Sequence, residues 1–240
     1  AAVLGALDDK IAVNERIAAT TRELGQAIFH QAVRSDDAEE RELASVAEFL
    51  SRGVTPRYTD DNSQLMVLNQ KCIRYGRVIL EQARRTMADK VPPLKLLKTH
   101  DVLVNSTGVG TLGRVARWTA DFPCTVDSHV TIVRFDVTKV DPVCAGFAML
   151  AAQSEIERLG EGSTGQTELS RTKLGALRIL LPSPRRVAEL RASLDSLEAR
   201  GEAALAEATT LAELRDTLLP KLMSGELRVR DAEKAVEEAL

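Results

Sequence analysis

A glycine-rich hexapeptide is the clearest candidate for chemistry in this chain. Gly108-Val-Gly-Thr-Leu-Gly113 matches the G-x-G-x-x-G pattern of dinucleotide-binding proteins. That use requires a strand before the motif, a helix after it and an acidic residue about 20 positions further on. A strand is expected before it, but residues 114–118 also have the pattern of a strand. The motif therefore predicts a hairpin turn that lets another backbone come close, a DNA backbone being one candidate.

The other apparent catalytic motif is the run Asp127-Ser128-His129, which contains the residue types of a hydrolase triad. Neighbours on a strand point to opposite faces, so the three side chains cannot converge as a triad requires. The sequence also contains no P-loop, nucleophile elbow, H-E-x-x-H motif or Asn/Asp-Pro-Pro-aromatic box. We therefore expect a binding module, not an enzyme.

The histidines and cysteines show no metal-site spacing. His30 and His100 have no carboxylate or cysteine at ligand distance along the chain, and Cys72, Cys124 and Cys144 are odd in number. The three cysteines are typical of reduced thiols in a cytoplasmic protein. No metal or cofactor is expected on this chain.

Two polar segments have the composition of nucleic-acid contacts. Asn105-Ser-Thr107 follows a predicted strand, and residues 162–173 (GSTGQTELSRTK) form a polar loop with two cations. Amide, hydroxyl and guanidinium groups hold phosphates and read base edges. For Asn105-Ser-Thr107, capping of a turn explains each residue about as well, and residues 162–173 could also be an ordinary surface loop.

The elements that would position these residues are strands in the centre and helices at both ends. Short β-branched runs predict strands at residues 102–104, 115–116, 130–135 and 175–181, and residues 142–159 have helical spacing. Apolar residues three or four apart predict helices over 3–29, fading near 34–37, and over 185–223, with a short acidic helix at 230–239. The fold class is α+β, with a β-rich domain flanked by two long helices packed as an antiparallel pair.

The two terminal helices resemble each other. A shift of 190 positions superposes residues 4–29 on 194–219, with Leu4 on Leu194, Leu7 on Leu197 and Leu24 on Leu214. We therefore expect an N-terminal helical region at 1–41, a central domain at 42–183 and a C-terminal helix with its tail at 184–240.

Charge separates the same regions. The 240 residues carry a net charge of −3, yet residues 52–117 hold 12 basic against 5 acidic residues, a balance of +7. The acidity lies on the helices, and the basic half of the central domain suits a polyanion. No stretch approaches the ~20 apolar residues that cross a bilayer, so no membrane role is expected.

Together these segments resemble the specificity (S) subunit of Type I restriction–modification enzymes. The resemblance covers nearly the whole chain, and the stretch LRDTLLPKLMSGELR at 214–228 is quite specific to the C-terminus of that family. The other stretches are residues 3–11, residues 101–115, and residues 162–167 with 174–182. The family alternates two target-recognition domains with two long helical regions, and this chain resembles the second half.

The resemblance implies a bacterial, cytoplasmic and nucleoid-associated subunit that reads one half of a bipartite target in double-stranded DNA. Methyltransferase subunits, and in a restricting complex a motor-nuclease subunit, would be its partners, with S-adenosylmethionine bound on the methyltransferase. The helices would act as a ruler, because 27 residues at ~1.5 Å each span about 40 Å. The residues expected to contact DNA are Lys71, Arg74, Arg77, Asn105, Ser106, Thr107, Thr111, Arg114, Ser128, His129, Thr164, Gln166, Thr167, Arg171 and Lys173.

Three alternatives remain open. The chain begins Ala-Ala-Val, and it is either a fragment of a longer subunit or a natural half-subunit that homodimerises on a palindromic split site. A helical scaffold that binds only proteins would show no salt-sensitive DNA affinity. An enzyme that uses the glycine-rich turn would be stabilised by a nucleotide.

Overall fold

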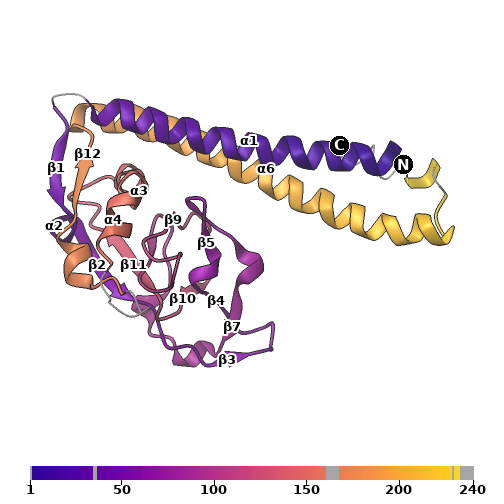
Figure 1. Ribbon diagram of the computed structural model, residues 1–240, viewed down its shortest axis with the longest axis horizontal. Helices are drawn as coiled ribbons and strands as arrows, with labels where there is room; N and C mark the ends of the chain where they lie inside the picture. The colour runs from indigo at the N-terminus through magenta and orange to yellow at the C-terminus, as the bar shows by residue number, and fades with distance from the viewer. Residues whose placement is uncertain (1, 35–36, 161–167, 229, 233–240) are drawn as a thin grey trace. The chain divides into compact units, whose positions relative to one another are not determined.

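The structure is a computed structural model that describes residues 2–34, 37–160, 168–228 and 230–232. The chain divides into two compact units, shown in Figure 1. The helical unit contains residues 1–28 and 192–240, and the β-rich unit contains residues 29–191.

The helical unit holds most of two long helices, α1 (Ala2–Val33) and α6 (Pro184–Ser224), whose residues 29–33 and 184–191 belong to the β-rich unit. Lys10 pairs with Glu207 at 3.3 Å, and Asp8 pairs with Arg215 at 2.9 Å, so numbers rise on one helix as they fall on the other. The two helices are therefore antiparallel, as predicted (Figure 1). The seam that joins them is built from leucine and isoleucine residues three or four apart. It contains Leu4, Leu7, Ile11, Leu211, Leu214, Leu218 and Leu222.

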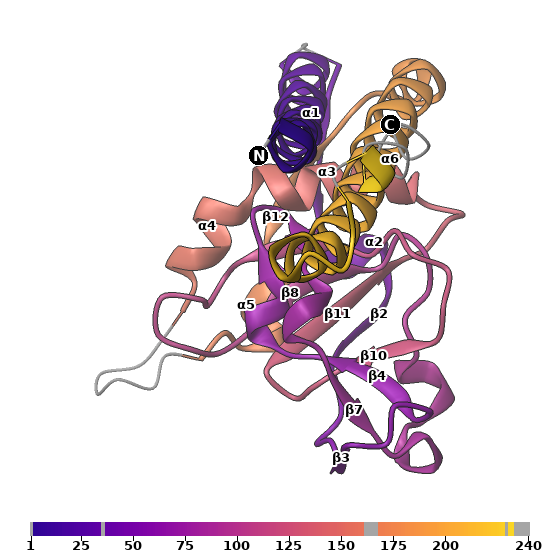
Figure 2. The same ribbon diagram turned by 90° about the vertical axis from the view of Figure 1, so that its right-hand side faces the viewer.

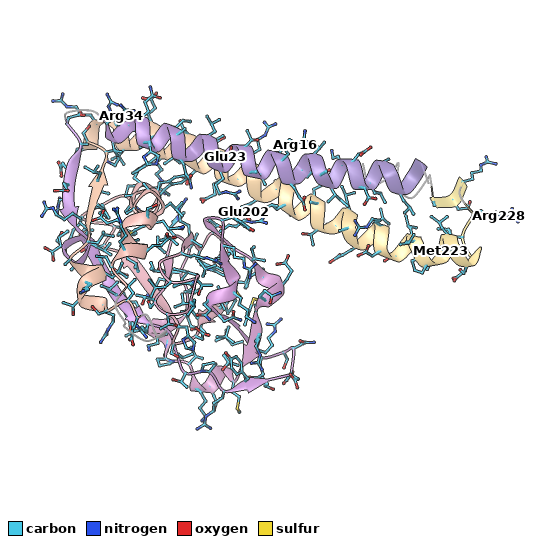
Figure 3. All side chains as sticks on the ribbon, viewed as in Figure 1. Arg16, Glu23, Arg34, Glu202, Met223 and Arg228 are labelled. Atoms are coloured by element: carbon cyan, nitrogen blue, oxygen red, sulfur yellow. The ribbon has the colours of Figure 1, made fainter. Side chains whose placement is uncertain are left out.

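Both ends of α6 have recognisable signals. The helix begins at Pro184, whose fixed φ suits a first helical position. It continues through Pro220 and is followed by Gly225, which has a φ of +76°. Figure 3 shows Met223 near this end of α6, with Arg228 beyond it.

The β-rich unit contains two four-stranded sheets. In the central sheet the order is β2–β11–β8–β9, and every pair is antiparallel. In the second sheet the order is β10–β4–β7–β3, and the β10–β4 pair is parallel (Figure 2). The strands of the central sheet are β2 (Ala47–Arg52), β11 (Val130–Phe135), β8 (Val102–Asn105) and β9 (Val115–Arg117). Those of the second are β10 (Cys124–Val126), β4 (Leu65–Leu68), β7 (Arg84–Thr86) and β3 (Tyr58–Thr59).

Smaller elements complete this unit. Two strand pairs, β1 with β12 and β5 with β6, are antiparallel. Their bounds are β1 (Glu39–Glu42), β12 (Arg178–Leu181), β5 (Ile73–Arg74) and β6 (Arg77–Val78). The short helices are α2 (Leu43–Val46), α3 (Pro142–Ala151), α4 (Gln153–Arg158), α5 (Arg171–Gly175), η1 (Gln70–Cys72), η2 (Leu80–Gln82), η3 (Ala88–Lys90) and η4 (Pro93–Lys95).

One apolar core joins the two large sheets. Leu68 of β4, Leu103 of β8 and Ile132 of β11 are fully buried in it, together with Ile73 of β5. Trp118, just after β9, is the largest buried side chain of the cluster. Because strands from both sheets bury their side chains in the same cluster, the sheets form a single packed body.

A buried ion pair lies in the same unit. The Arg134 guanidinium on β11 donates to both carboxylate oxygens of Asp101, at 2.8 and 2.7 Å. It also donates to the main-chain oxygen of Leu96 at 2.8 Å, and the Lys98 amide donates to Asp101 at 2.8 Å. The pair therefore ties the segment before β8 to the central sheet.

Most predicted elements are confirmed, and the exceptions have local causes. The strands at β8, β9 and β11 and the α+β class are as expected. The helix predicted over 142–159 is interrupted at Ala152, between α3 and α4. The strand predicted over 175–181 covers only β12, because Ser170 caps a helical turn, α5, just before it. Most of the helix predicted at 230–239 lies outside the described residues.

Candidate nucleic-acid interface

The glycine-rich segment is the turn between β8 and β9. Gly108, Gly110 and Gly113 have φ values of +104°, +71° and +81°, which L side chains rarely adopt. The predicted hairpin turn is confirmed, and because a strand follows it, the dinucleotide-binding context is absent. The backbone that comes close is the chain's own. A Cβ on Gly113 would lie 2.6 Å from the Cα of Glu157 in α4.

Buried amides support this turn from beneath. The Asn105 side chain donates to the main-chain oxygens of Gln70, at 2.9 Å, and of Thr111, at 3.1 Å. The side-chain oxygens of Asn105 and Gln70 are buried and have no hydrogen-bond partner among the described residues. A Cβ on Gly108 would lie 2.5 Å from the Gln70 oxygen. The turn thus packs against η1, and Asn105 positions it.

Hydroxyl groups and an imidazole lie on the outer side of the same region. Thr107 Oγ1 and His129 Nδ1 are 2.7 Å apart, and the His129 ring is exposed. Ser106 is buried, and its hydroxyl is bonded to that of Thr131. Thr107 and His129 therefore present hydrogen-bonding groups to solvent, whereas Ser106 holds β8 to β11.

The structure also shows how Asp127 is used. Its carboxylate accepts the backbone amide of His129 at 2.9 Å, while the ring of His129 meets Thr107. Burial raises the pKa of Asp127, and the hydrogen bond from the His129 amide opposes that rise. Asp127, Ser128 and His129 therefore do not form a catalytic triad, because the His129 ring contacts Thr107.

Four predicted cations lie either on the turn, as Arg114 does, or on the segment from η1 to β6 that packs against it. Lys71 and Arg74 are exposed, with Arg74 Nε donating to the Lys71 oxygen at 3.2 Å, and Arg77 is half-buried. Arg114 is also half-buried, and it donates to the Gly110 oxygen at 2.7 Å. None of the four forms an ion pair with a carboxylate among the described residues, so their charges are uncompensated at short range.

The short helix η1, which carries Lys71, also contains the buried thiol of Cys72. Asn69 and Cys72 form a capping box around η1, which fixes the Lys71 backbone. Burial raises the pKa of Cys72 to about 11, so the thiol stays protonated at neutral pH. Cys72 is therefore a packing residue of the apolar core.

The remaining predicted residues are not all gathered here. Thr164, Gln166 and Thr167 lie outside the described residues. Arg171 and Lys173 belong to α5 and not to a loop, because Ser170 caps that helix, and Ser128 is half-buried beside His129. The end of the polar loop does reach the turn: Glu168 forms a β-bridge with Thr107, and the Leu169 amide donates to the Ser106 oxygen at 2.8 Å.

Sequence reasoning missed two residues of this region. Gln70 supports the turn, and no pattern in the sequence signals that contact. Tyr75 lies at the tip of the β5–β6 hairpin with 73% of its surface exposed. A Tyr-Gly dipeptide between two arginines was the available signal, since two-residue hairpins usually have glycine in the turn.

The described residues show neither a metal-site cluster nor a membrane-spanning helix. They contain no group of three or more His, Cys, Asp or Glu side chains that could hold a metal ion. Their helices include none that is long and apolar enough to span a bilayer.

Comparison with known proteins gives similarity in structure only. No protein-family model and no curated protein matches the sequence. The Type I restriction–modification S subunit from M. genitalium superposes with a TM-score of 0.65 at 16% identity, over 91% of this chain and 58% of that one. The HsdS subunit from Thermoanaerobacter tengcongensis superposes with a TM-score of 0.53 at 15% identity, over 94% of this chain and 56% of that one.

The chain has the fold of a Type I S subunit. A third solved structure, described as showing complex assembly and conformational transition of the type I R-M system, gives a TM-score of 0.51 at 15% identity. The chain spans 56–58% of the length of these three S-subunit-like chains. The resemblance found in the sequence is therefore confirmed at the level of the fold, and it covers somewhat more than half of each solved chain.

Proposed function

We propose that this chain is a DNA-reading subunit of a Type I restriction–modification system and performs no reaction itself. In this proposal the β-rich unit reads one half of a bipartite target in duplex DNA, and α1 and α6 dock methyltransferase subunits. The observation that carries it is the solvent-facing pair of Thr107 and His129 at a turn that also carries Arg114 and packs against η1, which carries Lys71. Neither cation forms an ion pair among the described residues. The S-subunit fold supports the same conclusion.

The chemistry of the cluster suits duplex DNA. Lysine and arginine at the surface release counterions from phosphates and so supply affinity. Hydroxyl and imidazole groups can donate to or accept from base edges, which supplies sequence preference. The turn that carries Thr107 and Arg114 is held by buried contacts to η1 and α4, so these two side chains are presented in a fixed arrangement.

The long helices suit a spacing role. At ~1.5 Å per residue, the 32 residues of α1 extend about 48 Å, more than the ~34 Å of one turn of DNA. In the proposed complex the helices fix the distance to a second half-site, which another copy or another part of a longer chain reads. The methyltransferase partner binds S-adenosylmethionine and flips the adenine out of the stack. A motor-nuclease subunit completes a restricting complex.

The direct test is a salt series of DNA affinities for Arg114→Ala. We expect weaker binding at every salt concentration and, if Arg114 contacts a phosphate, a slope of log K against log salt that is shallower by about 1. Arg186→Ala is the matched control, because Arg186 is an exposed arginine at the start of α6. Equal affinity of Arg114→Ala and the native chain at all salt concentrations would refute this placement.

Partner and assembly need separate measurements. Co-purification with an adenine methyltransferase subunit, followed by mapping of methylated adenines, should give a split motif if the chain directs methylation. Light scattering of the chain alone separates a monomer from the homodimer that a half-subunit would form. A chain that binds proteins but shows no salt-sensitive affinity for DNA would instead be a helical scaffold.

A further inference from the structure

The hairpin formed by β5 and β6 has an unusual tip. Ile73 pairs with Val78 and Arg74 with Arg77, which leaves Tyr75 and Gly76 as a two-residue turn. Their φ values are +55° and +72°. Positive φ at both central residues is typical of a type I′ turn, whose first position favours asparagine, aspartate or glycine. The requirements of the turn therefore do not explain a tyrosine at position 75.

Two further features of the tip are unfavourable for the isolated chain. Tyr75 is 73% exposed, so it contributes little to the core. Arg74 and Arg77 lie directly opposite each other, and like charges in that position repel. Strained backbone that survives in a folded chain is concentrated at functional sites, which makes this tip a candidate for one.

The base of the hairpin is firmly held. Ile73 is fully buried, and Val78 packs against the same core. The Ile79 amide donates to the Cys72 oxygen at 2.8 Å, which closes the hairpin at its base. Both strands also contact β9, the strand that follows the glycine-rich turn. The tip, with Arg74 and Arg77 on either side of Tyr75, is therefore held on a fixed base beside β9.

We propose that the β5–β6 hairpin enters a groove of the duplex and that Tyr75 contacts base edges there. This proposal rests on the DNA-reading function proposed above. The major groove admits a two-stranded β-ribbon, and an aromatic ring can pack on the methyl group of thymine. Phosphates on the two sides of the groove neutralise Arg74 and Arg77, which removes their mutual repulsion. Tyr75 is then a specificity-determining residue.

The test selects binding sites from a pool of duplexes with a randomised central segment, using the full 240-residue chain. Native chain, Tyr75→Asn and Tyr75→Phe are compared. Asparagine suits positive φ, so the melting temperature of Tyr75→Asn should be unchanged or higher. Its affinity for the natively selected duplex should fall about tenfold, with base preference lost at one or two adjacent positions. Tyr75→Phe should select the same base motif as the native chain, because the aromatic ring makes the contact.

The control is Leu94→Asn, which removes a similarly exposed apolar side chain from η4 in the same unit and should alter neither motif nor affinity. If the native chain selects no motif, the DNA-reading function fails and the hairpin proposal fails with it. If the native chain selects a motif that Tyr75→Asn binds equally well, only the hairpin proposal fails. A Tyr75→Phe chain that behaves like Tyr75→Asn also overturns the ring contact.

Discussion

The helical unit and the β-rich unit bury their residues in different ways. In the helical unit burial follows one narrow stripe, around Leu7, Leu211 and Leu218. The β-rich unit buries every residue of β8, β9, β10 and β11. The ion pairs of the two units also differ in burial: Asp8–Arg215 in the helical unit is exposed, whereas Asp101–Arg134 in the β-rich unit is buried.

The difference follows from what each region must hold in place. A helix satisfies its own backbone hydrogen bonds, so the pair needs only a periodic seam and tolerates changes outside it. A sheet satisfies its hydrogen bonds between segments distant in sequence, so its turns and buried polar groups must fit each other. We therefore expect substitutions in the β-rich unit to be costly wherever two segments meet, and those in the helical unit to be costly only on the seam.

The largest expected effect comes from Asp101→Asn. It leaves the buried Arg134 charge without its partner and should lower the free energy of unfolding by about 3–5 kcal/mol, measured by urea denaturation. The double variant Asp101→Leu with Arg134→Met removes both charges and should recover most of that loss. If the free energy of unfolding of Asp101→Asn lies within about 1 kcal/mol of the native value, the ion pair contributes little to stability.

On the helical seam, Leu211→Ala should lower stability by about 3 kcal/mol, because it opens a cavity beside Leu7. Hydrogen exchange measured peptide by peptide should show faster exchange in α1 and α6. Leu219→Ala is the control: Leu219 lies on the same helix but is 41% exposed, so only a small change is expected. Equal effects of the two variants would contradict a narrow seam.

At the glycine-rich turn, Gly113→Ala should destabilise by about 2 kcal/mol, since it adds a left-handed alanine and a clash with the Glu157 backbone. Gly110→Ala shares the positive φ but has open space around it, so it should cost about 1 kcal/mol. Thermal unfolding of both variants measures the difference. A Gly110→Ala chain that is the less stable of the two would argue against close approach of α4.

The smallest effect is expected at Asn14, a buried asparagine on α1 whose Nδ2 has no partner among the described residues. Asn14→Leu should raise the stability of the helix pair by about 1 kcal/mol, because it removes an unsatisfied polar group. Guanidinium denaturation followed by helical circular dichroism measures it. Lower stability in this variant would show that the side chain is satisfied in solution and sets the register of the helices.

Several features of the site were accessible to sequence reasoning because they depend on neighbours along the chain. The glycine-rich turn follows from three glycines between two β-branched runs. Thr107 and His129 were both named as candidates, but their 2.7 Å contact joins residues 22 positions apart. Arg171 and Lys173 were assigned to a loop because the Ser170 cap of α5 was not recognised.

The sequence alone determined the long helices and the principal strands, because helical and strand periodicity act over a few neighbouring residues. Only the tertiary structure decided what lies beside the glycine-rich turn, namely Gln70, Glu157 and the segment at Glu168. It also decided which predicted polar residues face solvent and which, like Asn105 and Ser106, are buried. The reason is that pairing of distant strands depends on the packing of the whole core, which no local pattern records.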